Sequence, residues 1–309
     1  MDQALKWVDL EQYIKLPVPL EFSFKENLKY LSRSTNECLL RIHNNKVYKA
    51  ICLEDKPYVI EVSEDPVTPQ TISVTFLGPF ISTASHRIEI ARHVREWFDL
   101  DTDLAPFYEM ARQDRILRRA VESFYGLRNM GIPDLFEAIC WGIIGQQINL
   151  SFAYTLKRRL VEKYGRNIEH EGEQYWLFPT PEVIASLTVE DMDDLRMTVK
   201  KREYLINIAQ LFIDGHLSKE SLLAAMDCKT AENILVRIRG IGPWTANYVL
   251  MRCLRFRSAF PIDDVGLHNA IKYVLELETK PTKDELRVIS AGWSNWESYA
   301  TFYLWRFLY

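Results

Sequence analysis

The sequence predicts an α+β protein in which a small N-terminal antiparallel sheet is followed by helices. Three observations predict this class. Short runs rich in Val, Ile, Tyr and Leu fill roughly the first 80 residues, the apolar period becomes helical near Ser85, and no strand pattern returns after Leu104. A chain of 309 residues exceeds one ordinary core, so two or three domains are expected.

The sheet is predicted from four apolar runs divided by turn residues. Asn44-Asn45 favours a hairpin turn between the first two runs, and clusters of Asp, Glu and Pro separate the others. A helix is expected next, because Ile88, Ala91 and Val94 fall on one helical face. The strands are expected at 37–43, 46–53, 58–62 and 71–76, and this helix at 85–100.

The rest of the chain is predicted to be helical. Pro133 suits the first turn of one helix, and Gly145 begins a break before the next. No long linker, repeat or low-complexity segment occurs, so the domains are expected to pack tightly. Helices are expected at 106–125, from 133, at 152–164, 181–186, 189–195, 200–214 and 219–225, on both sides of 240–243, and at 264–274, 282–290 and 296–307.

The most specific pattern is a helical hairpin. Gly240 is expected to end one helix, because glycine tolerates a positive φ, and Gly242-Pro243 suits the cap and first position of the next. Two residues without β-carbons would let a phosphate approach the backbone, and free N–H groups at the second helix favour an anion. A bare Gly-x-Gly would equally suit an ordinary packing corner between helices.

The net charge of −4 is not typical of a nucleic-acid binder. The charge is uneven, however. Residues 196–257 contain eleven Lys or Arg against five Asp or Glu, a local balance of +6. This excess surrounds the hairpin, where phosphate would bind, although a solvated helix surface would also account for it.

Two adjacent acids, Asp263 and Asp264, follow the second helix of the hairpin. One of them is expected to cap a helix that starts near Val265, because Asp is a preferred N-cap. Capping does not require a second carboxylate. The pair therefore suggests one acid that caps and one that acts chemically.

A polar island and a set of aromatic residues complete the candidate site. Gly145-Gln146-Gln147 suits a solvated turn, or a loop whose amides fill the space left by an extruded base. Aromatic residues near helix ends are individually common in cores. Together with an acid they would form a pocket that stacks on a base and attracts a cation. The aromatic set is Trp244, Tyr248, Tyr303 and Trp305.

Missing patterns argue against other classes. The five cysteines show neither C-x-x-C nor C-x6-C-x2-C-x5-C spacing, so disulfide, zinc and iron–sulfur frameworks are not supported. The six histidines form no triad pattern, and no phosphate-binding glycine loop occurs. The N-terminus lacks a signal-peptide core, and polar residues interrupt the apolar stretch 138–156. A cytoplasmic protein is expected, associated with the nucleoid if bacterial, with no membrane contact.

These motifs resemble the helix-hairpin-helix DNA glycosylases of the 3-methyladenine DNA glycosylase II (AlkA-like) type. The resemblance is strong over 131–309 and weaker over the first hundred residues, where that family has a TBP-like sheet domain. It implies a TBP-like domain at 1–110, an all-α domain at 111–134 plus 257–309, and another at 135–256. The hairpin would lie at about 231–256, and the active site in the cleft between the two all-α domains.

The resemblance also assigns roles. Asp264 would be the catalytic residue. Gln146 and Gln147 would form the wedge or gap loop. The base pocket would be lined by Trp244, Tyr248, Trp305 and, from the sheet domain, Leu28. DNA phosphate would be held by Gly240, Gly242 and the backbone of Thr245, and a monovalent cation, Na⁺ or K⁺, by the carbonyls of Val236, Ile238 and Ile241.

The expected reaction is monofunctional excision of alkylated purines from damaged double-stranded DNA, without a cofactor or an obligate protein partner. Bifunctional members place a Lys where this chain has Trp244, and an indole cannot form an imine. The chain also departs from the best-known type at Gln147, where the wedge is Leu, and at Val265, where a Tyr follows the catalytic Asp. Two alternatives are a glycosylase of the same fold acting on oxidised purines, and a non-catalytic DNA-binding module.

Overall fold

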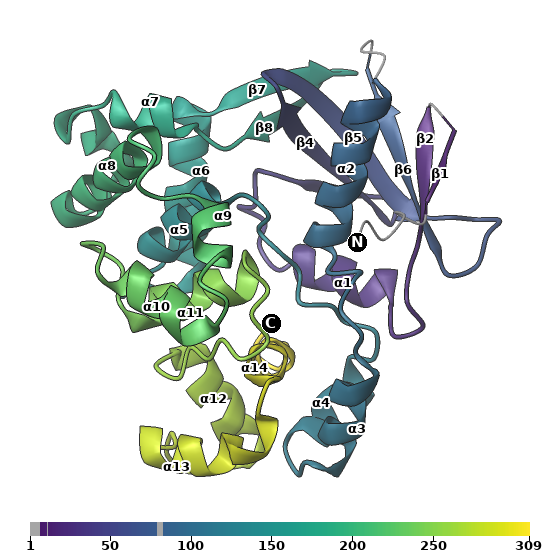
Figure 1. The fold of residues 1–309 in the computed structure, drawn as a ribbon, viewed down its shortest axis with the longest axis vertical. Coiled ribbons are helices and arrows are strands. Elements are labelled where there is room, and N and C mark those ends of the chain that lie inside the picture. The colour runs from purple at the N-terminus through teal and green to yellow at the C-terminus, as the bar shows by residue number, and fades with distance from the viewer. Residues whose placement is uncertain (1–6, 11, 79–82) are drawn as a thin grey trace.

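The fold joins a six-stranded antiparallel sheet to a larger helical region (Figure 1), as the predicted class requires. The computed structural model describes residues 7–10, 12–78 and 83–309. The sheet has the order β1-β2-β6-β5-β4-β3. Its strands are β1 (Val8–Asp9), β2 (Tyr13–Pro17), β3 (Arg41–His43), β4 (Lys46–Leu53), β5 (Lys56–Glu64) and β6 (Thr71–Leu77).

Tight turns set the register of the sheet. Asn44 and Asn45 have φ of 49° and 57°, and Glu54 and Asp55 have φ of 47° and 62°, the left-handed pair that two-residue hairpins need. The turn at Glu54-Asp55 pairs Val47 with Val62, and Val62 in turn pairs with Val74 of β6. These three valines are fully buried, and helix α2 (Ala84–Trp97) packs beside the sheet.

Two parts of the strand prediction are wrong. Helix α1 (Phe24–Leu31) lies within the region expected to be mostly strand; Ser23 caps it by accepting a hydrogen bond from the N–H of Glu26. The hairpin of β7 (Arg166–His170) and β8 (Glu173–Leu177) lies in the region expected to contain only helices. Its strands are joined at Glu171-Gly172, both with positive φ, and Tyr175 packs against Ala50 and Val59 of the sheet.

The helical region otherwise follows the predicted order, except that the helix expected at 106–125 is interrupted between Gln113 and Leu117 and the one expected at 189–195 is a 3-10 helix. Pro133 precedes its helix rather than starting it, because Asp134 is the N-cap. None of the described helices is long and apolar enough to cross a membrane. The helices are α3 (Ala105–Gln113), α4 (Leu117–Ser123), α5 (Leu135–Ile144), α6 (Leu150–Tyr164), α7 (Pro181–Ala185), α8 (Val199–Ile213), α9 (Lys219–Leu223), α10 (Cys228–Val236), α11 (Pro243–Arg252), α12 (Val265–Val274), α13 (Lys283–Ile289) and α14 (Glu297–Trp305), with 3-10 turns at Glu190–Leu195 and Ser290–Trp293.

A buried polar network joins the sheet region to the helices. The Arg128 side chain is fully buried and donates to the carbonyls of Asp99, Thr102 and Glu21. The backbone N–H of Arg128 in turn donates to the side-chain carbonyl of Asn27 on α1. Because a buried guanidinium is costly unless its donors are satisfied, this network favours one arrangement of the two regions. That arrangement places α1 against the cleft described next.

Candidate active site

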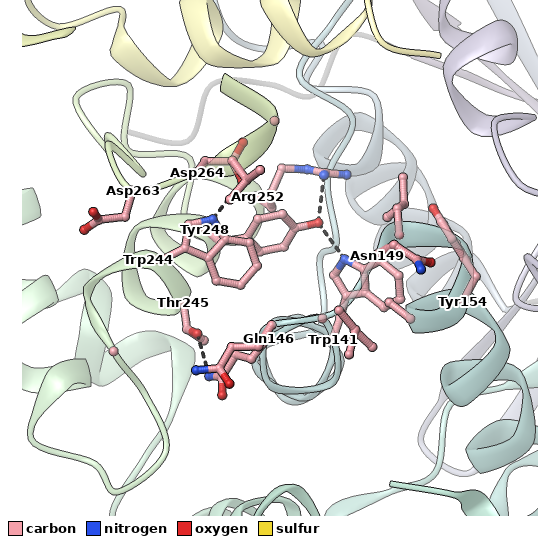
Figure 2. Close-up of a pocket in the computed structure, with 18 of the residues that line it drawn as sticks. Trp141, Gln146, Asn149, Tyr154, Trp244, Thr245, Tyr248, Arg252, Asp263 and Asp264 are labelled. Carbon is pink, nitrogen blue, oxygen red and sulfur yellow. Dashed lines mark hydrogen bonds between the residues drawn. The ribbon is translucent and has the colours of Figure 1, made fainter. Parts of the chain in front are cut away.

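A cleft of about 1580 Å³ lies where five segments meet. The α5–α6 loop and the α10–α11 hairpin line it, together with the start of α12, the end of α14 and the segment after α1. Figure 2 shows the aromatic and polar side chains that converge in it. Its residues come from distant parts of the sequence, and they include most of the predicted site.

The two hairpin positions Gly240 and Gly242 differ in why glycine is present. Gly240 has φ of +98°, and a β-carbon there would lie 2.5 Å from the ring of Tyr204, so both conformation and packing require glycine. A β-carbon on Gly242 would meet nothing within 4 Å. Gly242 is the N-cap of α11 and offers no side-chain cap, so the N–H groups of Trp244 and Thr245 remain available to an anion.

Asp264 occupies the centre of a hydrogen-bond cluster. Its Oδ1 accepts from the indole N–H of Trp305 at 2.7 Å and from the backbone N–H of Leu267 at 2.7 Å. Its Oδ2 accepts from the indole N–H of Trp244 at 2.8 Å. Only 9% of the residue is exposed. The carboxylate is therefore held from three directions at the edge of the cleft.

The expected division of labour between the two acids is wrong. Asp264 is itself the N-cap of α12, so the same residue caps the helix and lies in the aromatic cluster. Asp263 points away from that cluster (Figure 2) and forms an ion pair with Lys283. A single carboxylate serves both purposes because one oxygen caps while both accept indole donors.

His268, one turn further along α12, braces this loop. Its Nε2 lies 2.8 Å from the carbonyl oxygen of Ile262, and its Nδ1 lies 2.8 Å from that of Pro281. Carbonyl oxygens only accept, so each contact is a hydrogen bond when the ring nitrogen concerned carries the proton. The imidazole thus lies between the segment leading into Asp264 and the loop before α13.

Three of the four predicted aromatic residues come together. The ring centroids of Trp244 and Tyr248 are 5.6 Å apart with planes at 30°, and those of Tyr248 and Trp305 are 6.2 Å apart. Tyr303 does not belong to this pocket. It is fully buried in the core, where its hydroxyl contacts Tyr108 and donates to the carbonyl of Leu127.

The contribution of the sheet domain also differs from the expectation. Leu28, a residue of α1, is buried in the core and is not among the described residues that line the cleft. Tyr30 and Arg33 line it instead, with the Arg33 guanidinium 3.9 Å from the centroid of the Tyr30 ring. Helix geometry explains the difference, since residues two positions apart face different directions on α1.

Sequence reasoning missed the inner wall of the cleft. Trp141 and Tyr154 have ring centroids 4.8 Å apart, and Arg252, with 3% exposure, lies 5.4 Å from the centroid of the Tyr248 ring. Trp141 lies in the last turn of α5, just ahead of the polar island, and Arg252 ends the hairpin's second helix. Their nearness to the polar island and to the hairpin is a sequence clue to the cleft, but taken singly each residue looks like an ordinary core residue.

The two glutamines of the polar island do different things. The Gln146 amide donates to the carbonyl of Gly240 and to the hydroxyl of Thr245, both at 2.9 Å, which ties the loop to the hairpin. Gln147 is exposed on the cleft with φ of 57°. Lys201 donates to the carbonyls of Ile144 and Gln146 beneath this loop.

The three residues whose carbonyls are expected to hold a cation belong to the hairpin segment. Val236, Ile238 and Ile241 all line the cleft. The Ile238 carbonyl accepts from the N–H of Ile241 at 3.0 Å, and a carbonyl has a second lone pair for a further partner. Backbone oxygens are the hard ligands that such cations take. A monovalent cation at these carbonyls stays a prediction.

Comparison with known proteins agrees with this geometry. Residues 140–295 match the family described as HhH-GPD superfamily base excision DNA repair protein, and residues 15–139 match the N-terminal domain of 8-oxoguanine DNA glycosylase. The DNA-3-methyladenine glycosylase of Bacillus subtilis (strain 168) is 51% identical over 306 residues, which cover 99% of this chain and 100% of the relative.

Two solved structures share the fold. The 3-methyladenine DNA-glycosylase from Archaeoglobus fulgidus has a TM-score of 0.79 at 23% identity, over 95% of this chain and 97% of its own. The Clostridium acetobutylicum 8-oxoguanine glycosylase/lyase, in complex with double-stranded DNA, has a TM-score of 0.76 at 18% identity, over 97% and 96%.

Fold and site together define a DNA repair glycosylase that has a helix-hairpin-helix and one largely buried carboxylate, Asp264, at the edge of the cleft. The class follows from the matched family and from the carboxylate that the aromatic cleft encloses. More particularly, the chain belongs to the HhH-GPD superfamily of base excision DNA repair proteins, as a member of its DNA-3-methyladenine glycosylase branch.

Proposed function

We propose that this enzyme is a monofunctional glycosylase that removes alkylated purines, of the 3-methyladenine and 7-methylguanine type, from damaged double-stranded DNA. The observation that carries the proposal is Asp264, held by two indoles inside an aromatic cleft beside the hairpin. The Bacillus subtilis relative named DNA-3-methyladenine glycosylase supports the substrate class.

DNA binding is assigned to the hairpin and the α5–α6 loop. The open backbone at Gly242 and the free N–H groups of Trp244 and Thr245 would hold a phosphate. Amide contacts of this kind need less net positive charge than groove reading does, which reconciles a charge of −4 with DNA as the partner. Gln147 would fill the gap left by the flipped nucleotide, since Gln146 is already committed to the hairpin.

The reaction begins when the damaged nucleotide leaves the stack, at a cost of about a few kcal/mol. Trp244, Tyr248 and Trp305 would stack on the base and favour a cationic one. As the glycosidic bond breaks, the Asp264 carboxylate stabilises the positive charge that develops on the sugar, and water adds to C1′. A methylated cationic purine is already a good leaving group.

The product is expected to be an intact strand with an abasic site. Trp244 occupies the position of the imine-forming Lys in bifunctional relatives, and of the described residues that line the cleft none is a lysine.

The proposed domain division is 1–110, 111–134 plus 257–309, and 135–256, with the cleft between the last two domains. The enzyme would act in the compartment that contains the DNA, which in a bacterium is the cytoplasm.

Release of free base tests the proposal. The purified chain is incubated with DNA treated with dimethyl sulfate, and released bases are quantified by liquid chromatography and mass spectrometry. We expect 3-methyladenine and 7-methylguanine, and none from untreated DNA. Release of 8-oxoguanine alone, when an oligonucleotide containing it is assayed in parallel, would favour the oxidised-purine alternative, which the match to the 8-oxoguanine glycosylase N-terminal domain keeps open. Binding without release of any base would make the chain a non-catalytic module.

A further inference from the structure

The hydroxyl of Tyr248 has an unusual hydrogen-bond state. It accepts from the indole N–H of Trp141 at 2.8 Å and from the Arg252 guanidinium at 2.9 Å (Figure 2). Neither donor can accept in return, so both acceptor positions of the phenol oxygen are used. The hydroxyl proton is left over, and among the described residues no acceptor for it is found.

The surroundings keep that proton in place and aim it at a ligand. Tyr248 is 5% exposed and lines the cleft. Burial raises the pKa of its hydroxyl, so the group stays a donor. Arg252 forms no ion pair within the described chain; it donates to the Met130 carbonyl and to Tyr248. A second guanidinium, Arg33, lies at the same end of the cleft.

We propose that the Tyr248 hydroxyl donates a hydrogen bond to an acceptor on the flipped base, and that this bond assists departure of uncharged purines. The inference rests on the proposed function and extends its substrate class. Trp141 and Arg252 hold the donor: by occupying both acceptor positions they direct the remaining O–H toward the base. The unpaired guanidinium also favours an electron-rich edge at this end of the cleft.

The chemistry makes the effect depend on the charge of the base. The C1′–N9 bond breaks with its electron pair on the base, and water adds its oxygen to C1′ and loses a proton. An uncharged purine takes up a proton as it departs, whereas with a cationic methylated purine the proton from water goes to solvent. A cationic methylated purine leaves neutral, whereas an uncharged purine develops negative charge as it leaves. A fixed donor is worth most where charge develops, and losing one typically costs about 10²–10³-fold in rate.

Tyr248→Phe tests this, because it keeps the stacking ring and removes only the hydroxyl. Single-turnover release is measured for two oligonucleotides, one with hypoxanthine as an uncharged purine bearing a carbonyl oxygen, and one with cationic 7-methylguanine. We expect release of hypoxanthine to fall by about 100-fold and that of 7-methylguanine by less than about 10-fold. Tyr164→Phe is the matched control, since its hydroxyl donates to Asp191 away from the cleft.

The outcomes separate this inference from the proposed function. A wild-type enzyme that releases neither base would fail the proposed function itself. A wild-type enzyme that releases 7-methylguanine but no hypoxanthine, or a variant that loses both equally, would overturn the inference alone. If Tyr248→Phe does not fold, Trp141→Phe carries the test, because it frees one acceptor position and should lower the hypoxanthine rate selectively by a smaller factor.

Discussion

Asp264→Asn is the perturbation that most directly tests the active-site assignment. Asparagine caps helices about as well as aspartate, so the N-cap of α12 should survive. The bond from Trp305 to Oδ1 can also persist. The amide nitrogen that replaces Oδ2 would face the indole N–H of Trp244, and two donors cannot bond to each other.

The magnitudes of the two effects differ widely. Loss of the acceptor for Trp244 should cost about 1 kcal/mol of stability, or roughly 2–4 °C in melting temperature. Loss of the charge should cost far more in rate. Two opposite unit charges about 4 Å apart interact by about 4 kcal/mol at an effective dielectric constant of about 20, which corresponds to roughly 10³-fold.

The assay is single-turnover release of 7-methylguanine, with thermal melting and DNA binding measured on the same preparation. Asp263→Asn is the matched control. Its ion pair with Lys283 is largely exposed and worth less than about 1 kcal/mol, so the rate should fall by at most about fivefold. A folded Asp264→Asn enzyme with wild-type turnover, or a larger loss at Asp263, would refute the reasoning.

Three other outcomes are expected. Gly242→Ala should fold normally and weaken binding to damaged and undamaged DNA alike, as measured by fluorescence anisotropy. Gly240→Ala should instead lower the melting temperature, because its β-carbon meets Tyr204. A loss of binding by Gly242→Ala that is confined to damaged DNA would show that the hairpin reads the base. Glu37→Gln should lower the free energy of unfolding in urea by about 3–5 kcal/mol, because it leaves the buried Lys157 ammonium unpaired. Burial alone would raise the pKa of Glu37, but Lys157 holds that pKa below the ordinary 4.5. The difference in free energy of unfolding between wild type and variant should therefore be full above pH 4.5 and shrink as pH falls. A difference that stayed undiminished in acid would contradict this. Borohydride during turnover should trap no covalent protein–DNA complex, and breaks should appear only after alkali; efficient trapping would reveal a lysine that reaches the sugar.

Local signals made the hairpin and the helix of Asp264 predictable. Glycine at a positive φ, proline after a cap and aspartate before a helix each act within a few residues, so the sequence contains the whole cause. Similar local signals occur at Ser23, which caps α1, and at Glu171-Gly172, which turns the β7–β8 hairpin. These two elements therefore also have local causes in the sequence.

The inner wall of the cleft could not be predicted in the same way. Trp141 and Tyr248 are separated by 107 positions, yet they share a hydrogen bond, and Tyr30 reaches the cleft from the sheet region. Contacts of this range depend on how whole elements pack, which the apolar period of each element does not specify. The same limit explains Leu28: the resemblance places it in the base pocket, whereas it is buried in the core and Tyr30 lines the cleft instead.

The packing also explains why a short loop and a hairpin can act on DNA together. The Gln146 amide bridges the Gly240 carbonyl and the Thr245 hydroxyl, while Lys201 holds the carbonyls of Ile144 and Gln146 from below. The backbone that we propose binds phosphate and the neighbouring loop 145–147 are thereby ordered when the chain folds, not when DNA binds. Ordering flexible side chains and loops is a main cost of association, so this bracing leaves more of the interaction energy for extruding the base.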